Sequence, residues 1–171
     1  MIQVGIFILL SILLLAFTLN RSHRHRFPRF FAVESLLILV LLNAGSWFRN
    51  PFSFRQLVSW TFLTRSLILA FHGFRLLRLQ GAPKNDIEEN TKLVTTGAYR
   101  YVRHPLYCTL LLVGIGVFLK DTSLLALIVF FILTGFVFFM GKIEEEENIE
   151  RFGKEYCIYM EKTKMFIPFL I

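Results

Sequence analysis

The sequence predicts an all-α integral membrane protein with about five transmembrane helices. The 171 residues are 55% hydrophobic and only 18% charged, and twenty of them are phenylalanine. A soluble domain of this length cannot bury so much apolar surface. The apolar residues form long runs, and the basic residues flank these runs as membrane anchors do. The net charge of +7 is therefore better explained by a membrane than by nucleic acid.

The first three runs predict three transmembrane helices. Residues 2–19 are almost wholly apolar, and positive charge follows this run instead of preceding it, which favours a transmembrane helix over a signal peptide. Four arginines lie within residues 21–29, so this loop is expected in the cytoplasm and the N-terminus outside. Residues 30–48 and 56–79 are the second and third expected helices, joined by a short outer turn at 49–55.

Polar residues interrupt the second and third runs. Glu34 and His72 are expected at similar depths, as are Asn43 and Arg65. A charge inside a bilayer is costly without a partner, so these residues either pair between helices or extend towards a membrane face.

Two further spans are expected after the polar loop at residues 80–90. Pro105 suits the first turn of a helix that runs to Leu119, although this run is shorter than the roughly 20 residues that cross a bilayer. Residues 120–123 form a tight outer turn in which Asp121 to Ser123 can cap the next helix. Residues 124–140 return to the cytoplasm, which places the C-terminus there. Of the nineteen Lys and Arg, fifteen then lie on the cytoplasmic side.

The C-terminal part predicts an amphipathic helix from Lys142, followed by an apolar segment, 165–171, at the interface. One face of this helix carries residues at helical spacing: Glu145, Phe152, Tyr156 and Tyr159. We expect one membrane domain, 1–171, in which residues 1–79 supply three helices and residues 80–171 the functional core. Cys108 and Cys157 do not make a disulfide framework.

Two polar blocks, 93–107 and 144–159, adjoin the last two apolar runs on the same predicted face. Arg103-His104-Pro105 opens a helix, where free amides and an arginine favour an anion, although interface anchoring is an alternative. Glu144 to Glu147 form an acidic run, which is usually a solvated face. Acids match an anionic inner leaflet poorly, so a cationic partner is expected, either Arg103 or a ligand. Aromatic rings for a ligand, or simply an aromatic belt, come from Tyr99, Tyr107, Tyr156 and Tyr159.

His104 is a candidate general base or a group that orients a ligand by hydrogen bonding. A metal or haem site is not expected, because the four histidines have no ligand spacing.

The segment from Leu93-Val94-Thr95-Thr96-Gly97-Ala98-Tyr99 to Arg103-His104-Pro105-Leu106-Tyr107 resembles the signature of the isoprenylcysteine carboxyl methyltransferase family. So does the Glu144-Glu145 pair before Phe152-Gly153. The wider superfamily includes phospholipid N-methyltransferases. The resemblance covers roughly residues 93–168. It implies a membrane methyltransferase that binds S-adenosyl-L-methionine at the cytoplasmic face, releases S-adenosyl-L-homocysteine and acts on a lipid or another lipophilic molecule.

The same resemblance implies roles for individual residues. Arg103 and His104 would act in catalysis, Arg103 by organising the site or by holding an anionic substrate group. Glu144, perhaps with Glu145, would bind a polar part of the cofactor. The remaining cofactor contacts would come from Lys92, Leu93, Val94, Tyr99, His104, Pro105, Leu106 and Tyr107. The glycines of Gly114-Ile115-Gly116 would allow close approach of helices or of the cofactor.

The acceptor stays open on the sequence alone. Met140 stands where the prenylcysteine enzymes of that family carry an arginine implicated in substrate binding, so the acceptor is a carboxylate, an amine or a thiol. Two other classes remain as alternatives: a membrane reductase that uses NADPH, and a non-enzymatic lipid-binding subunit.

Overall fold

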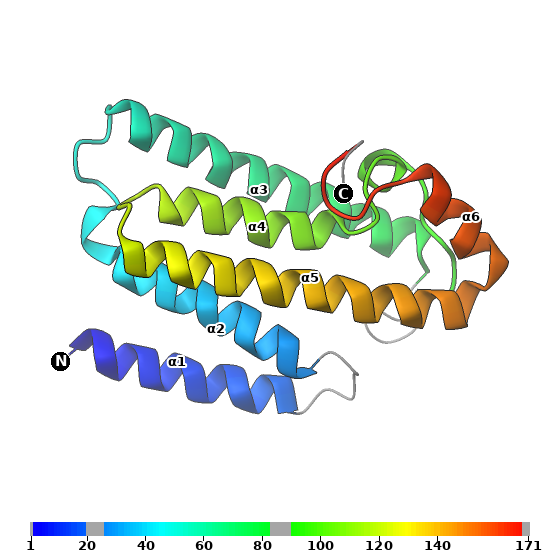
Figure 1. Ribbon diagram of the computed structural model, residues 1–171, viewed down its shortest axis with the longest axis horizontal. Helices are drawn as coiled ribbons and strands as arrows, with labels where there is room; N and C mark the ends of the chain where they lie inside the picture. The colour runs from blue at the N-terminus through cyan, green and yellow to red at the C-terminus, as the bar shows by residue number, and fades with distance from the viewer. Residues whose placement is uncertain (1, 20–25, 83–89, 169–171) are drawn as a thin grey trace. The chain divides into compact units, whose positions relative to one another are not determined.

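The computed structural model describes residues 2–19, 26–82 and 90–168, and within them the chain is helical (Figure 1). Six α-helices follow one another, and two short 3-10 helices lie between them. The bounds are α1 Ile2–Leu19, α2 Arg26–Leu42, η1 Ala44–Ser46, α3 Phe54–Gln80, η2 Gly97–Arg100, α4 Pro105–Phe118, α5 Leu124–Phe152 and α6 Lys154–Lys162. The basic loop at 21–25 and most of the polar loop at 80–90 lie outside the described residues.

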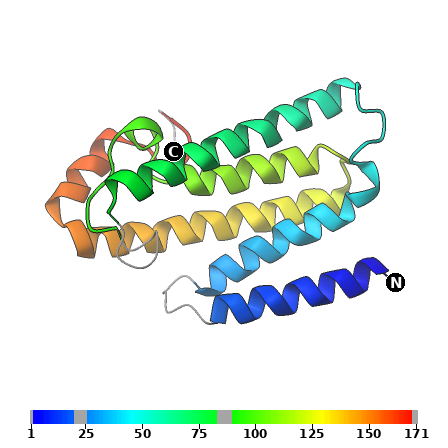
Figure 2. The same ribbon diagram turned by 180° about the vertical axis from the view of Figure 1, so that it is seen from behind.

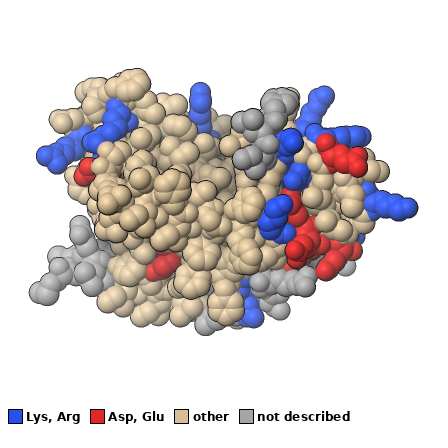
Figure 3. Space-filling model, in the orientation of Figure 1, with Lys and Arg blue, Asp and Glu red and all other residues tan. Residues whose placement is uncertain are grey.

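Within the described residues two helices, α3 and α5, are long and apolar enough to cross a membrane, whereas the sequence predicts five spans. The helices α1, α2 and α4 have 18, 17 and 14 residues and fall short of the roughly 20 that a span requires. Large apolar side chains are nevertheless exposed on α1, α2, α3 and α5, for example Leu13, Phe31 and Phe131. Figure 3 shows broad stretches of surface without Lys, Arg, Asp or Glu. This is the surface of a membrane protein.

The chain forms two compact units, each discontinuous in sequence. The first comprises Met1–Leu63 and Leu110–Ile143, and the second Thr64–Thr109 and Glu144–Ile171. Helices α3, α4 and α5 therefore contribute residues to both units.

Apolar contacts between four helices form the core of the first unit. Leu39 of α2, Val117 of α4 and Val129 of α5 are buried together, and Leu63 of α3 packs against them. Helix α1 packs beside α2 (Figures 1 and 2). Ser11 of α1 donates a hydrogen bond to the carboxylate of Glu34 at 2.6 Å.

Two other polar groups of the first unit are also held within it. The side-chain amide of Asn43 donates to the carbonyl of Leu39 at 2.9 Å. Lys120, expected in an outer turn, is fully buried, and its Nζ donates to Gln56 Oε1 at 2.9 Å and lies 3.6 Å from the ring centre of Trp60. The pairings considered from the sequence, of Glu34 with His72 and of Asn43 with Arg65, stay a prediction.

The expected cap of α5 is present, but its expected end is wrong. Ser123 Oγ accepts a hydrogen bond from the amide of Ala126 at 3.1 Å, as an N-cap residue does. The sequence predicts that the span ends at Met140 and a separate amphipathic helix begins at Lys142. Instead α5 continues without a break to Phe152, because residues 142–152 are rich in the good helix formers Lys, Glu and Arg and contain no Gly or Pro. The break falls at Gly153, whose positive φ of 57° suits glycine.

The glycine pair of α4 allows helices to pack closely. Ser59 of α3 donates a hydrogen bond to the carbonyl of Gly116 at 2.6 Å. A Cβ on Gly116 would lie 2.8 Å from Leu63 and 3.2 Å from the carbonyl oxygen of Ser59. A Cβ on Gly114 would lie 2.7 Å from Leu133 of α5. Of the two uses that the sequence suggests for these glycines, the structure shows the packing of helices.

Gly116→Ala is expected to destabilise the protein by about 1–3 kcal/mol, because the new methyl group overpacks the contact between α3 and α4. Gly135→Ala is the matched control, since a Cβ at this helical position meets nothing within 4 Å. The control is expected to be neutral or more stable by up to about 1 kcal/mol, through its helix propensity. Thermal unfolding of the full chain in detergent measures both. Equal shifts for the two variants would contradict the packing role.

Candidate functional site

A short backbone pairing joins the first polar block to the C-terminal segment within the second unit. Val102 forms an isolated parallel bridge with Lys164. The amide of Arg103 donates to the carbonyl of Lys164 at 2.8 Å, and the amide of His104 donates to that of Met165 at 3.2 Å. The segment that the sequence places at the membrane interface begins at Met165. Met165 is only 3% exposed, so this segment packs beside Arg103 and His104 from the start. Residues 169–171 lie outside the described residues.

Arg103 is held by an ion pair and by two backbone carbonyls. Its Nε donates to Oε1 of Glu145 at 2.7 Å, and a second nitrogen lies 2.6 Å from the same oxygen. The third nitrogen donates to the carbonyls of Met160 at 3.2 Å and Thr163 at 2.5 Å. The side chains of Arg103 and Glu145 are 9% and 4% exposed. The pair therefore joins α5, the end of α6 and the start of α4 out of contact with water.

His104 is buried between two carboxylates and two aromatic rings. Its Nδ1 lies 3.7 Å from Glu144 and its Nε2 lies 3.8 Å from Glu145. Both distances exceed hydrogen-bond length, and Nε2 makes no hydrogen bond with any residue that the structure describes. The ring stacks on Tyr107 at 5.4 Å between centroids, with Phe166 at 5.9 Å. The imidazole is thus fixed in position while one buried nitrogen remains available.

The carboxylates raise the pKa of His104. Burial of the ring disfavours its charged form and lowers the pKa. Interactions with Glu144 and then with Glu145 act in the opposite direction and outweigh burial, so the pKa lies above the ordinary 6.5. The site therefore favours a proton on this ring.

Three buried tyrosines adjoin this cluster. Tyr99, Tyr156 and Tyr159 are 7%, 2% and 7% exposed, and the hydroxyl of Tyr159 donates to the carbonyl of Tyr99 at 2.5 Å. Burial raises the pKa of Tyr99, and the negative charge of Glu144 raises it further. The Tyr99 phenol stays neutral at physiological pH, so it acts by hydrogen bonding and ring contact and not as an anion.

The remaining predicted cofactor residues have different surroundings. Val94 is buried, whereas Lys92 is exposed and its amide donates to the carbonyl of Gly81 at 3.1 Å. Leu93, Pro105 and Leu106 are half-buried or buried. Leu106 lies against Gly73 of α3, where a Cβ would be 3.1 Å from its side chain.

Gly97 is a constrained position that the signature contains. Its φ is +59°, and a Cβ there would lie 2.8 Å from Nε2 of His72 and 2.6 Å from Leu76. Both the backbone conformation and the space therefore require glycine. The sequence does not predict this approach of His72, because nothing in the spacing relates α3 to the signature.

The described residues contain no group of three or more His, Cys, Asp or Glu side chains placed to hold a metal ion. The buried cysteine, Cys108, donates its thiol to the carbonyl of Phe166 at 3.2 Å.

The sequence profile of the phospholipid methyltransferase family matches residues 54–155, which is more than half of the chain. The chain belongs to this family. The matched range includes the first polar block and the second as far as Glu155. The Arg103–Glu145 pair and His104 therefore lie within the part of the chain that matches the family. Residues 156–168, which complete the site, lie beyond it.

Curated relatives of this family member carry a more specific name. The protein-S-isoprenylcysteine O-methyltransferase of Saccharomyces cerevisiae is 36% identical over 88 residues, which are 51% of this chain and 37% of that protein. Protein-S-isoprenylcysteine O-methyltransferase A of Arabidopsis thaliana is 33% identical over 89 residues, 51% of this chain and 45% of that protein. The Xenopus laevis protein of the same name is 35% identical over 89 residues. The chain spans less than half the length of these relatives.

Sequence reasoning missed the contribution of the C-terminal segment. Phe166 contacts the His104 ring, and the carbonyls of Met160 and Thr163 bind Arg103. Every residue type has a backbone carbonyl, so no sequence pattern indicates the contacts of Met160 and Thr163 with Arg103. The apolar character of 165–168 was visible, but it fits a buried segment and a membrane interface equally well.

Arg103→Met is expected to destabilise the protein by about 3–5 kcal/mol, because it leaves the Glu145 carboxylate buried without its partner. The double variant Arg103→Met, Glu145→Met is expected to recover most of this loss, since it removes both charges. Arg100→Met, at an exposed arginine nearby, serves as the control. Thermal unfolding in detergent measures all four proteins. A double variant no more stable than the single one would show that the ion pair does not govern this region.

Stability is expected to fall as the pH rises above about 6.5. The folded state binds the His104 proton more tightly than the unfolded state, so this contribution is complete below the ordinary pKa and is lost as the pH rises through the raised one. His104→Asn is expected to flatten the dependence of the unfolding temperature on pH, and Glu144→Gln to shorten its range. His72→Asn, at an exposed histidine, is the control. An unchanged dependence in His104→Asn would assign the titration to another group.

Proposed function

We propose that this family member transfers a methyl group from S-adenosyl-L-methionine to a lipophilic acceptor, at the cytoplasmic face of a membrane. The observation that carries the proposal is the convergence of His104, Glu144 and Glu145 from two distant segments into one unit. Membership of the phospholipid methyltransferase family and the names of the curated relatives support it.

The residues present fit the polar parts of this cofactor. Its ammonium group and sulfonium are cationic and its ribose carries hydroxyls, so it needs acceptors and aromatic rings. Glu144 is 30% exposed and supplies an accessible carboxylate beside His104. Within the described residues, Nε2 of His104 is one of the buried polar atoms that lack a hydrogen bond, and a ligand would supply one. Tyr107 and Tyr99 supply the rings.

Arg103 has a positioning role in this proposal. Its nitrogens are bound by Glu145 and by the carbonyls of Met160 and Thr163. An anionic substrate group would have to displace one of these contacts. Of the two roles that the family resemblance implies for Arg103, organisation of the site is therefore the better supported. Glu145 is correspondingly a partner of Arg103, and Glu144 is the carboxylate that binds the cofactor.

When bound, S-adenosyl-L-methionine supplies an electrophilic methyl group on a positively charged sulfur. The protein's contribution is placement in a dry pocket, which can provide most of the acceleration. A carboxylate acceptor arrives ionised and needs no base. An amine acceptor must lose a proton, which His104 can accept only at a pH above its raised pKa, where the ring is neutral.

The acceptor that the relatives' names favour is the carboxylate of an isoprenylcysteine. Met140 is apolar where prenylcysteine enzymes carry an arginine, so a lipid amine or thiol remains within the proposal. We propose that α1 to α5 are five spans, with local thinning of the bilayer around the short helices α1, α2 and α4, the N-terminus outside and the C-terminus in the cytoplasm. The distribution of Lys and Arg along the sequence supports this orientation.

Glu144→Gln is expected to weaken the binding of S-adenosyl-L-homocysteine at least about tenfold, because a charge-assisted contact contributes roughly 1.5–3 kcal/mol. Glu147→Gln, which removes one charge from the same acidic run, is the matched control and is expected to change binding little. Isothermal titration of the full chain in detergent measures both.

Equal losses of affinity in the two variants would show that the acidic run acts only as a diffuse negative charge. Binding of NADPH, with silence toward S-adenosyl-L-homocysteine, would replace the proposal by a reductase. Silence toward both would favour a lipid-binding subunit. Incubation with labelled methyl donor and a lipid extract then identifies the acceptor.

A further inference from the structure

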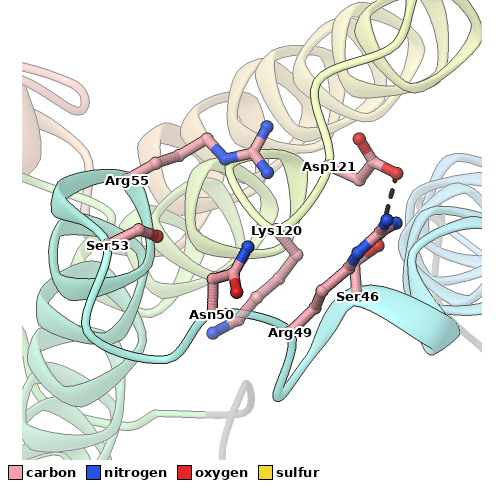
Figure 4. A pocket seen from close by; sticks show the side chains of 7 residues that line it. All are labelled: Ser46, Arg49, Asn50, Ser53, Arg55, Lys120 and Asp121. Carbon is pink, nitrogen blue, oxygen red and sulfur yellow. Dashed lines mark hydrogen bonds between the residues drawn. The ribbon is translucent and has the colours of Figure 1, made fainter.

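A polar cavity lies in the first unit, and none of its lining residues belongs to the proposed methyl-transfer site. Its volume is about 310 Å³. The connection from α2 to α3 and the connection from α4 to α5 enclose it. Its lining residues are Ser46, Arg49, Asn50, Ser53, Arg55, Lys120 and Asp121 (Figure 4).

We propose that this cavity binds the phosphate group of a membrane phospholipid. Three cations line it and only one carboxylate does. Phosphate is an anion that accepts hydrogen bonds from arginine forks, amides and hydroxyls, and the lining supplies all of these donors. The proposal does not depend on the proposed enzymatic function.

The two arginines have donors to spare. Figure 4 shows the Arg49 side chain reaching from the connection between α2 and α3, and the Arg55 side chain reaching from the first turn of α3. Arg49 forms no side-chain hydrogen bond or ion pair within the described part of the chain, and Arg55 has only a long contact of 3.5 Å to Thr122. The Asp121 carboxylate accepts from Ser46 at 3.2 Å, and within the same part of the chain neither arginine pairs with it.

The positions of the basic residues in the sequence also support an anion-binding site at this cavity. Arg49, Arg55 and Lys120 are the three Lys and Arg that the expected topology places outside, where such residues are otherwise depleted. All three line this one cavity. Scattered interface anchors would not need to converge on a single hollow.

The aromatic residues of the same connection favour a lipid over a free ion. Phe48, Phe52 and Phe54 are 78%, 88% and 83% exposed. Exposed phenylalanines are unfavourable in water but stable against acyl chains. A phosphate with attached acyl chains satisfies the arginines and covers these rings, whereas inorganic phosphate satisfies only the arginines.

The test compares Arg49→Gln, Arg55→Gln with the wild-type chain in neutral detergent. Native mass spectrometry measures retention of phosphatidylglycerol, of zwitterionic phosphatidylcholine and of inorganic phosphate. The wild type is expected to retain phosphatidylglycerol. The double variant is expected to bind it at least about tenfold more weakly, because each cation near a membrane surface strengthens the binding of an anionic lipid and the variant lacks two. Both arginines are exposed, so folding is expected to survive, and thermal unfolding checks this.

Arg75→Gln, Arg78→Gln is the matched control, since it removes two exposed arginines from α3 outside the cavity. It is expected to leave retention unchanged. Retention of inorganic phosphate alone, lost in the Arg49 and Arg55 variant, would keep the phosphate site but overturn its assignment to lipid. Retention of both lipids, weakened only in the Arg49 and Arg55 variant, would support the shared phosphate as the group that is bound. Equal retention in the two double variants would overturn the proposal.

Discussion

The buried ion pair between Arg103 and Glu145 is the interaction on which the second unit depends. Removing two charges from water is costly, and their attraction offsets that cost only where the remaining donors are also satisfied. Here the carbonyls of Met160 and Thr163 complete the arginine. These carbonyls belong to the last turn and C-cap of α6, where orphan acceptors and the helix dipole favour a cation. One side chain therefore holds the signature, α5 and α6 in a single arrangement.

The ion pair also separates neighbouring carboxylates into different roles. Consecutive positions on a helix point about 100° apart, so Glu144 and Glu145 approach different nitrogens of His104 and differ in exposure. Glu145 is 3% exposed and bound to Arg103, whereas Glu144 remains accessible beside His104. Glu146 is exposed. An acidic run that reads as one solvated patch thus contains a structural anchor, Glu145, between two more accessible carboxylates.

The sequence predicts the helices well and their long-range partners only in part. Apolar runs, Pro105 and the Ser123 cap locate α4 and α5, because these signals are local. The continuation of α5 to Phe152 was missed, since a change from apolar to charged residues marks a change of environment and not the end of a helix. A cation for the acidic run was expected and is found in Arg103, because an uncompensated carboxylate is unfavourable there. The pairing of Val102 with Lys164 involves only backbone, which no side-chain pattern reveals.

The buried and exposed cations of this chain differ in how completely the protein satisfies them, and this difference indicates their use. Arg103 has every nitrogen bound and Lys120 donates to Gln56 while resting on Trp60, so both serve the fold. Arg49 lines a cavity with its guanidinium unbound within the described residues. An arginine holds its full charge at any physiological pH, so an unsatisfied fork in a hollow favours an anion. The same reasoning assigns Arg103 of the second unit to the fold, since Glu145 and the carbonyls of Met160 and Thr163 bind its nitrogens.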